Sequence, residues 1–230
     1  MNLKINSMRI KLILILLYST FLFGQKTVEI KIESLTSLDE TPEERTFTIK
    51  YSITNKTNKT IHFILNPDNL IPISAGSLNP SVYYKVYEKE NSIDVSGIFT
   101  GKRTTRIFKD EAEVKKYNDS ITDTFINRTA EQVIQESKAR IIKNIQEMKP
   151  NETREYSSTL RWDKNRYFKN DVMEYYIDEK EPHFYELHIN LMKEELLSKF
   201  SEEEKNEILK DKNFIKGWFT SNKVEINFRE

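Results

Sequence analysis

The sequence predicts a mainly β protein, an antiparallel β-sandwich with two helical insertions. Apolar and polar residues alternate with a period of two near both ends of the chain, which is typical of half-buried strands. Helical spacing of three and four appears only between such segments. A parallel sheet would need continuously apolar strands and a helix after nearly every one. The predicted strands cover residues 27–35, 46–54, 61–65, 81–87, 156–162, 184–192, 214–219 and 223–228, with a further segment at 92–100.

The clearest strand covers residues 46–54. Its apolar face carries Phe47, Ile49, Tyr51 and Ile53. Residues 55–60 are a polar turn by composition, since the Asn55 side chain can imitate a turn peptide. Apolar alternation resumes at residues 61–65, so this region predicts a hairpin that buries one face.

Prolines make residues 66–80 a predicted loop or irregular edge, because proline cannot donate to a sheet ladder. Aromatic residues on both faces of 81–87 indicate that both faces are at least partly covered. The chain is expected to close as a strand, with Val224, Ile226 and Phe228 pointing inward.

The two helical insertions are predicted at about 101–150 and 193–212. In the first, residues 101–123 are charged and weakly patterned, and a helix is expected over 125–148 with one apolar stripe. Thr129 and Gln132 have the spacing of a capping box, and so do Ser201 and Glu204 in the second insertion.

Residues 1–24 have the order of a secretory signal peptide: basic residues, a short apolar run from Leu12 to Phe23, and Gly24 at the expected cleavage point. The run is too short to cross a bilayer as a helix, although an uncleaved anchor is an alternative. We therefore expect one domain, residues 25–230, exported to the periplasm, the cell surface or the medium. Its stability must come from core packing, because the chain contains no cysteine.

The charge balance favours neither nucleic acid nor an anionic membrane as a partner. The chain has 36 basic and 36 acidic residues, and the predicted signal carries only the basic residues Lys4, Arg9 and Lys11, so the exported domain is slightly acidic. Glycine-rich phosphate loops are also absent from the sequence.

Two segments resemble exported immunoglobulin-like domains. The run from Phe47 to Asn55 into Ile61-His62-Phe63 resembles their second and third strands. Residues 217–226 are similar to the closing strand of such domains in uncharacterised exported proteins of Bacteroidota. Gln25, directly after the predicted signal, also resembles those proteins. The resemblance implies an immunoglobulin-like β-sandwich and no activity. Unlike antibody domains, the chain lacks the paired cysteines.

Candidate binding residues fall into two groups. Aromatic residues gather in an irregular connection, where tyrosine offers contact area to a glycan or a peptide. These are Tyr167, Phe168, Tyr175 and Tyr176. A basic cluster of Lys102, Arg103, Arg106 and Lys109 opens the first insertion and could bind an anionic glycan or an acidic patch of a partner. The histidines His62, His183 and His188 are interpreted as structural, and no metal or cofactor is predicted.

No catalytic motif is visible, so the leading hypothesis is an exported binding or interaction module for a protein or a glycan. The main alternative is a secreted enzyme, or an enzyme inhibitor, with a site built from the inserted segments. A third possibility is an accessory domain of an envelope assembly.

Overall fold

The computed structural model describes residues 27–73, 79–93, 95, 98–100, 108–125, 127–164, 177, 180–191 and 194–229 of the 230-residue chain. The protein is mainly β with few helices, as the sequence predicts. The predicted signal peptide, residues 1–24, lies outside the described residues. Of the helices in the described ranges, none is both long and apolar enough to cross a membrane.

The first sheet has four strands in the order β1-β2-β9-β7, all antiparallel to their neighbours. These are β1 (Val28–Thr41), β2 (Glu44–Asn55), β9 (Thr153–Asp163) and β7 (Phe99–Thr100). The strand predicted at 27–35 extends to Thr41, because β1 stays paired with β2 beyond a bulge between Ile32 and Ser34.

The second sheet has six strands and is mixed. Its main order is β11-β10-β5-β4, with β12 also on β10 and β6 on β5. The strands are β4 (Asn66–Pro72), β5 (Ser81–Glu88), β6 (Asn91–Ile93), β10 (His183–Asn190), β11 (Trp218–Thr220) and β12 (Val224–Ile226). The irregular edge expected at 66–80 contains β4, which runs parallel to β5. The expectation that all pairing is antiparallel is therefore wrong at this edge.

A third, two-stranded sheet corrects two predictions. Strand β3 (Ile61–Ile64) pairs with β8 (Ile145–Met148), so the predicted hairpin of β2 with residues 61–65 does not form. Both edges of β2 are already occupied, by β1 and β9. The helix expected over 125–148 also ends early, because the Asn144 amide bonds to the carbonyl of Ile141 (3.0 Å) and its side chain donates to the carbonyl of Arg140 (2.8 Å).

Both predicted insertions contain helices. They are α2 (Glu111–Phe125) and α3 (Ala130–Lys143) in the first, and the 3-10 helix η2 (Glu194–Lys199) and α4 (Glu202–Lys210) in the second. The capping boxes predicted at Thr129 and Ser201 are confirmed. Helix α2 lies mostly where the sequence suggested no regular structure.

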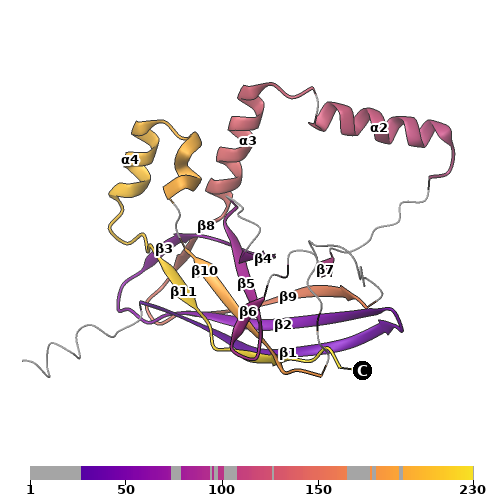
Figure 1. Cartoon of the computed structure of the whole chain (residues 1–230). Helices are drawn as coiled ribbons and strands as arrows, with labels where there is room; N and C mark the ends of the chain where they lie inside the picture. Colours follow the sequence, from indigo (N-terminus) through magenta and orange to yellow (C-terminus); the bar gives the residue numbers. More distant parts are fainter. Residues whose placement is uncertain are drawn as a thin grey trace, which may run out of the picture.

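The main core lies between the two large sheets, whose strands cross one another in Figure 1. The predicted apolar face of β2 is confirmed, and the alternate apolar residues of the segment predicted as a strand at 184–192 are buried with it. Phe47, Ile49, Tyr51, Ile53, Tyr185, Leu187, Ile189 and Leu191 are all fully buried. At the carboxy-terminal end Ile226 and Phe228 are buried as predicted, and Val224 is half-buried.

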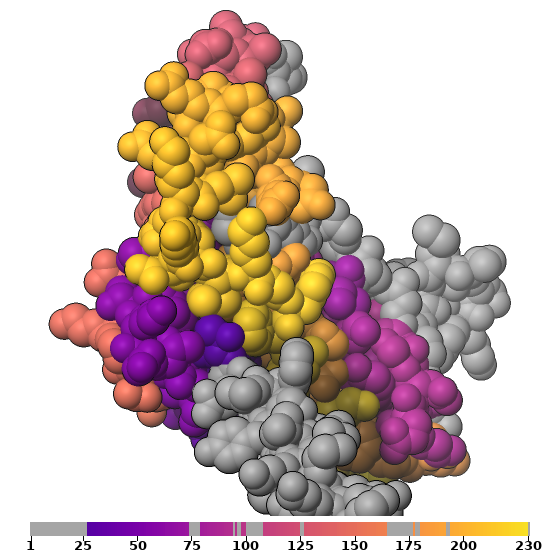
Figure 2. Space-filling model, turned by 90° about the vertical axis from the view of Figure 1, so that its left-hand side faces the viewer, coloured from indigo at the N-terminus to yellow at the C-terminus, as the bar shows by residue number. Residues whose placement is uncertain are grey.

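The carboxy-terminal segment closes one side of this core. Asn222 accepts a hydrogen bond from the Ile32 amide (2.8 Å) and donates to the Ile32 carbonyl (3.2 Å), next to the bulge in β1. The Asn222 side chain thus makes the two hydrogen bonds with Ile32 that the backbone of a neighbouring strand would otherwise make. Figure 2 shows this segment, in yellow, on the surface beside the indigo and purple amino-terminal strands.

Replacing Tyr185 with phenylalanine should stabilise the fold by about 1 kcal/mol. Among the described residues, the buried Tyr185 hydroxyl has no hydrogen-bond partner, so its removal relieves a desolvation penalty while the ring keeps its stacking on Tyr84 (centroids 5.5 Å apart).

The matched control is Tyr51→Phe. The Tyr51 hydroxyl donates to the Pro67 carbonyl (2.7 Å), so losing it should cost about 1 kcal/mol. Urea unfolding measures the free energy of unfolding of both variants and of the parent. A Tyr185→Phe variant less stable than the parent would show that this hydroxyl does have a partner.

Candidate functional site

Helices α2 and α3 form an arm that extends from the sheets, with α2 farthest from them (Figure 1). Local sequence encodes the start of each helix. Asp110 accepts from the Glu113 amide (2.8 Å), while Glu113 accepts from the Lys109 amide (2.8 Å). At α3 the exchange is reciprocal: the Gln132 amide donates to the Thr129 hydroxyl (3.2 Å), and the Thr129 amide donates to the Gln132 side chain (2.9 Å). Side-chain caps encoded in the local sequence therefore stabilise the helices of the arm in addition to packing.

This arm carries most of the exposed large hydrophobic side chains in the described part of the protein. Six such residues are exposed there, and four of them are on the arm: Val114 and Ile121 on α2, Val133 and Ile142 on α3. Val114, Tyr117 and Ile121 follow the spacing of one helix face. Val114 and Ile121 are exposed, and Tyr117 between them is half-buried, with its ring against that of Phe108 (centroids 5.3 Å apart). Solvated helices more often present charged residues along such a face, so this stripe is a candidate contact surface.

The base of the arm is firmly attached to the body. Ile141 of α3 is buried in a small second core with Leu196, Leu197 and Phe200. Lys138 binds both carboxylate oxygens of Glu204 on α4 (3.0 and 2.8 Å). A rigid base of this kind lowers the entropic cost of binding at the far end.

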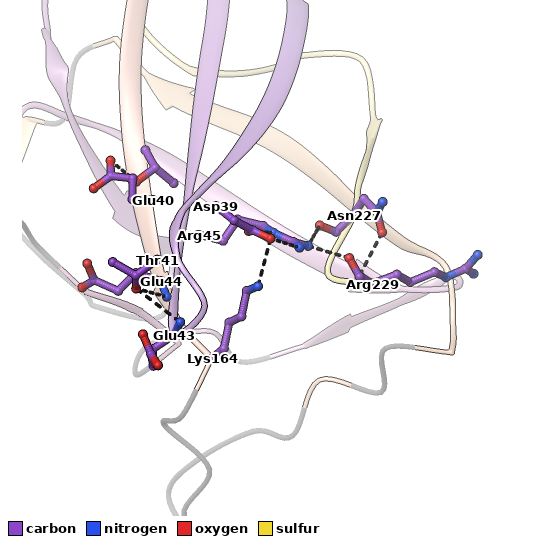
Figure 3. Close-up of polar contacts among 10 residues, drawn as sticks. Asp39, Glu40, Thr41, Glu43, Glu44, Arg45, Lys164, Asn227 and Arg229 are labelled. Atoms are coloured by element: carbon purple, nitrogen blue, oxygen red, sulfur yellow. Dashed lines mark hydrogen bonds and ion pairs between the residues drawn. The ribbon is translucent and has the colours of Figure 1, made fainter.

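A charged network lies at the end of the first sheet where β1 turns into β2, and its role is structural (Figure 3). The buried Arg45 guanidinium donates to both oxygens of Asp39 (2.5 and 3.0 Å) and to the carbonyls of Asn227 (3.1 Å) and Arg229 (2.7 Å). The hydrogen bonds from Arg45 and Lys164 hold the pKa of Asp39 well below its usual range. These contacts fasten the carboxy-terminal residues to the β1–β2 hairpin.

A polar cluster lies on the outer face of the second sheet. The Tyr87 hydroxyl donates to Glu186 (2.7 Å), and His188 Nε2 lies 2.8 Å from the same carboxylate oxygen. The Lys223 ammonium lies 3.6 Å from the centroid of the Tyr87 ring. Burial lowers the pKa of His188 despite the nearby carboxylate, so the ring is neutral at pH 7. His188 and Glu186 are two residues apart on β10, so their side chains share one face of the strand.

A shallow hollow on the first sheet is lined by Glu33, Lys50, Tyr51, Glu155, Tyr156 and Ser157. Glu33 accepts hydrogen bonds from Lys31 (2.6 Å) and Ser52 (2.9 Å), which lower its pKa. A glycosidase-type acid would need a raised carboxyl pKa, so Glu33 is unsuited to that role. In the described ranges, no group of three or more His, Asp or Glu side chains is arranged to hold a metal ion.

Of the binding residues predicted from the sequence, Lys109 is described and exposed. The others lie outside the described residues: Tyr167, Phe168, Tyr175 and Tyr176, and the basic residues Lys102, Arg103 and Arg106. Their roles stay predictions. Sequence reasoning missed the stripe on α2, although the spacing of Val114, Tyr117 and Ile121 is a usable signal.

No known protein-family model matches this chain, and no curated protein is similar to it.

Proposed function

We propose that this protein is an exported interaction module whose α2–α3 arm recognises another protein. The observation that carries the proposal is the exposed apolar stripe on a helix held away from the sheets by an anchored base. An amphipathic helix that offers side chains at this spacing is a common mode of peptide and protein recognition. Export and an immunoglobulin-like scaffold are parts of the same proposal. The packed sheets support such a scaffold, and the parallel β4–β5 pair departs from it.

Substituting both Val114 and Ile121 with serine should weaken partner capture from envelope extracts by about tenfold or more, because buried apolar anchors at interfaces typically contribute about 1 kcal/mol or more each. The matched control is Lys116→Ser with Asp119→Ser. These exposed residues lie on the opposite face of α2, and their joint removal leaves the net charge unchanged.

Circular dichroism should give the same helix content and melting temperature for both double variants. The interaction proposal fails if the parent chain captures no reproducible partner, or if the serine variant of the stripe captures it as well as the control does. Turnover of a substrate by the purified protein would instead favour an enzyme.

A further inference from the structure

His62 lies where the smaller sheet meets the chain that leaves α4. Its backbone amide donates to the Asn213 carbonyl (2.9 Å), and the Ile215 amide donates to the His62 carbonyl (2.8 Å). Its ring is close to that of Phe214 (centroids 5.8 Å apart). Residues 211–215 are therefore fastened to β3 around this one histidine.

The His62 ring lies between two carboxylates from different elements. Nδ1 contacts Asp211 at the end of α4, and Nε2 is 3.3 Å from Glu147 of β8. A neutral imidazole has one N–H and can donate to only one carboxylate. Only the protonated ring can donate to both Asp211 and Glu147. The charge state of His62 therefore decides whether both hydrogen bonds form.

Charges around the ring favour its protonated form. Burial alone would lower the pKa of His62, but the hydrogen bonds and negative charges of Asp211 and Glu147 outweigh burial and raise it. Arg154 bonds to the Glu147 carbonyl, but its own charge is paired with Glu152 (2.7 Å). The Asn213 amide and His62 together lower the pKa of Asp211.

The segment that His62 holds leads directly into the helical part of the protein. Helix α4 is joined to α3 through the Lys138–Glu204 ion pair, and Phe214 packs against the second core that contains Ile141, Leu197 and Phe200. A looser 211–215 segment would weaken the support of both helices.

We infer that His62 is a pH-sensitive latch, which in its protonated form fastens the helical lobe of α3, η2 and α4 to the β3–β8 sheet. A histidine with a raised folded pKa stabilises fully below its unfolded pKa of about 6.5, and this stabilisation is lost as pH rises through the folded pKa. Asp211, whose pKa is lowered, contributes fully above about pH 3.8 and loses this contribution at more acidic pH. The latch is strongest in weak acid and opens toward alkaline pH.

NMR titration of the histidine rings in the purified folded protein tests the electrostatics. The pKa of His62 should exceed 6.5 and should fall in Glu147→Gln and in Asp211→Asn. The control Glu155→Gln removes the same charge from an exposed position on β9 and should leave it unchanged. A His62 pKa at or below 6.5, or one insensitive to both substitutions, overturns the proposal.

Hydrogen exchange tests whether the charge of His62 controls how firmly residues 211–215 are attached to β3. After correction for intrinsic exchange rates, protection of the Ile215 amide should decrease from pH 6 to pH 8 by about tenfold for each unit by which the folded pKa of His62 exceeds that of the released ring. The Leu187 amide, bonded to Ser221 in the core, should not follow this trend. If His62→Gln shows the same pH dependence at Ile215 as the parent, His62 is not the latch.

Discussion

Replacing Phe47 with alanine is expected to lower the free energy of unfolding by about 3 to 5 kcal/mol. Phe47 is fully buried near the start of β2. Its ring meets those of Phe99 on β7, Trp162 on β9 and Phe228 near the carboxy terminus, with centroid distances of 6.0, 6.5 and 5.4 Å. The alanine variant would leave a cavity where three separate segments meet.

Urea unfolding followed by tryptophan fluorescence measures this loss, and Phe184→Ala is the matched control. Phe184 is on the face of β10 opposite to Tyr185 and Leu187, and it is only half-buried. Its truncation should therefore lower the free energy of unfolding clearly less. Equal losses in the two variants would mean that the aromatic cluster around Phe47 is not the centre of the core.

The faces of the strands were predictable from the sequence because a period of two fixes which side chains share a side. The buried set on β2 and β10 follows directly from that alternation. The choice of neighbour was not predictable for residues 61–64, since apolar alternation is the same whether β3 pairs with β2 or with β8. Asn55 supplied the correct turn but could not reveal that the chain leaves the first sheet there.

Helix ends were predictable where side chains encode them and not elsewhere. Thr129 and Ser201 form capping boxes that depend only on residues three apart. By contrast, Ile145 and Met148 continue the apolar spacing of α3 yet belong to β8, because pairing with β3 decides their conformation. Local periodicity cannot separate these outcomes.

The candidate sites show a similar division. The stripe on α2 follows from short-range spacing and was readable in principle. The latch joins His62 to Asp211, which are 149 positions apart, so only the folded arrangement brings the ring between its two carboxylates. Sequence reasoning could identify the histidine but not its partners.

Asn55→Asp is expected to destabilise the protein by about 3 kcal/mol or more at neutral pH, although the two side chains have nearly the same shape. The buried Asn55 Nδ2 group donates to the carbonyls of Lys59 (2.8 Å), Met148 (3.3 Å) and Lys149 (2.9 Å). Its Oδ1 accepts from the Thr57 amide (2.9 Å). A carboxylate would direct negative charge at three carbonyl oxygens and bury it unpaired.

The same substitution should make stability depend on pH in a defined direction. Burial and the facing carbonyls would raise the pKa of the new carboxyl group in the folded state. The penalty should therefore be smallest below the unfolded pKa of about 3.9, and should grow as pH rises through the folded pKa. Asn58→Asp makes the same chemical change at an exposed position of this turn and should be nearly neutral. Equal stability of the two variants at pH 7, measured by urea unfolding, would show that the Asn55 amide does not hold β2 to the segment after β8.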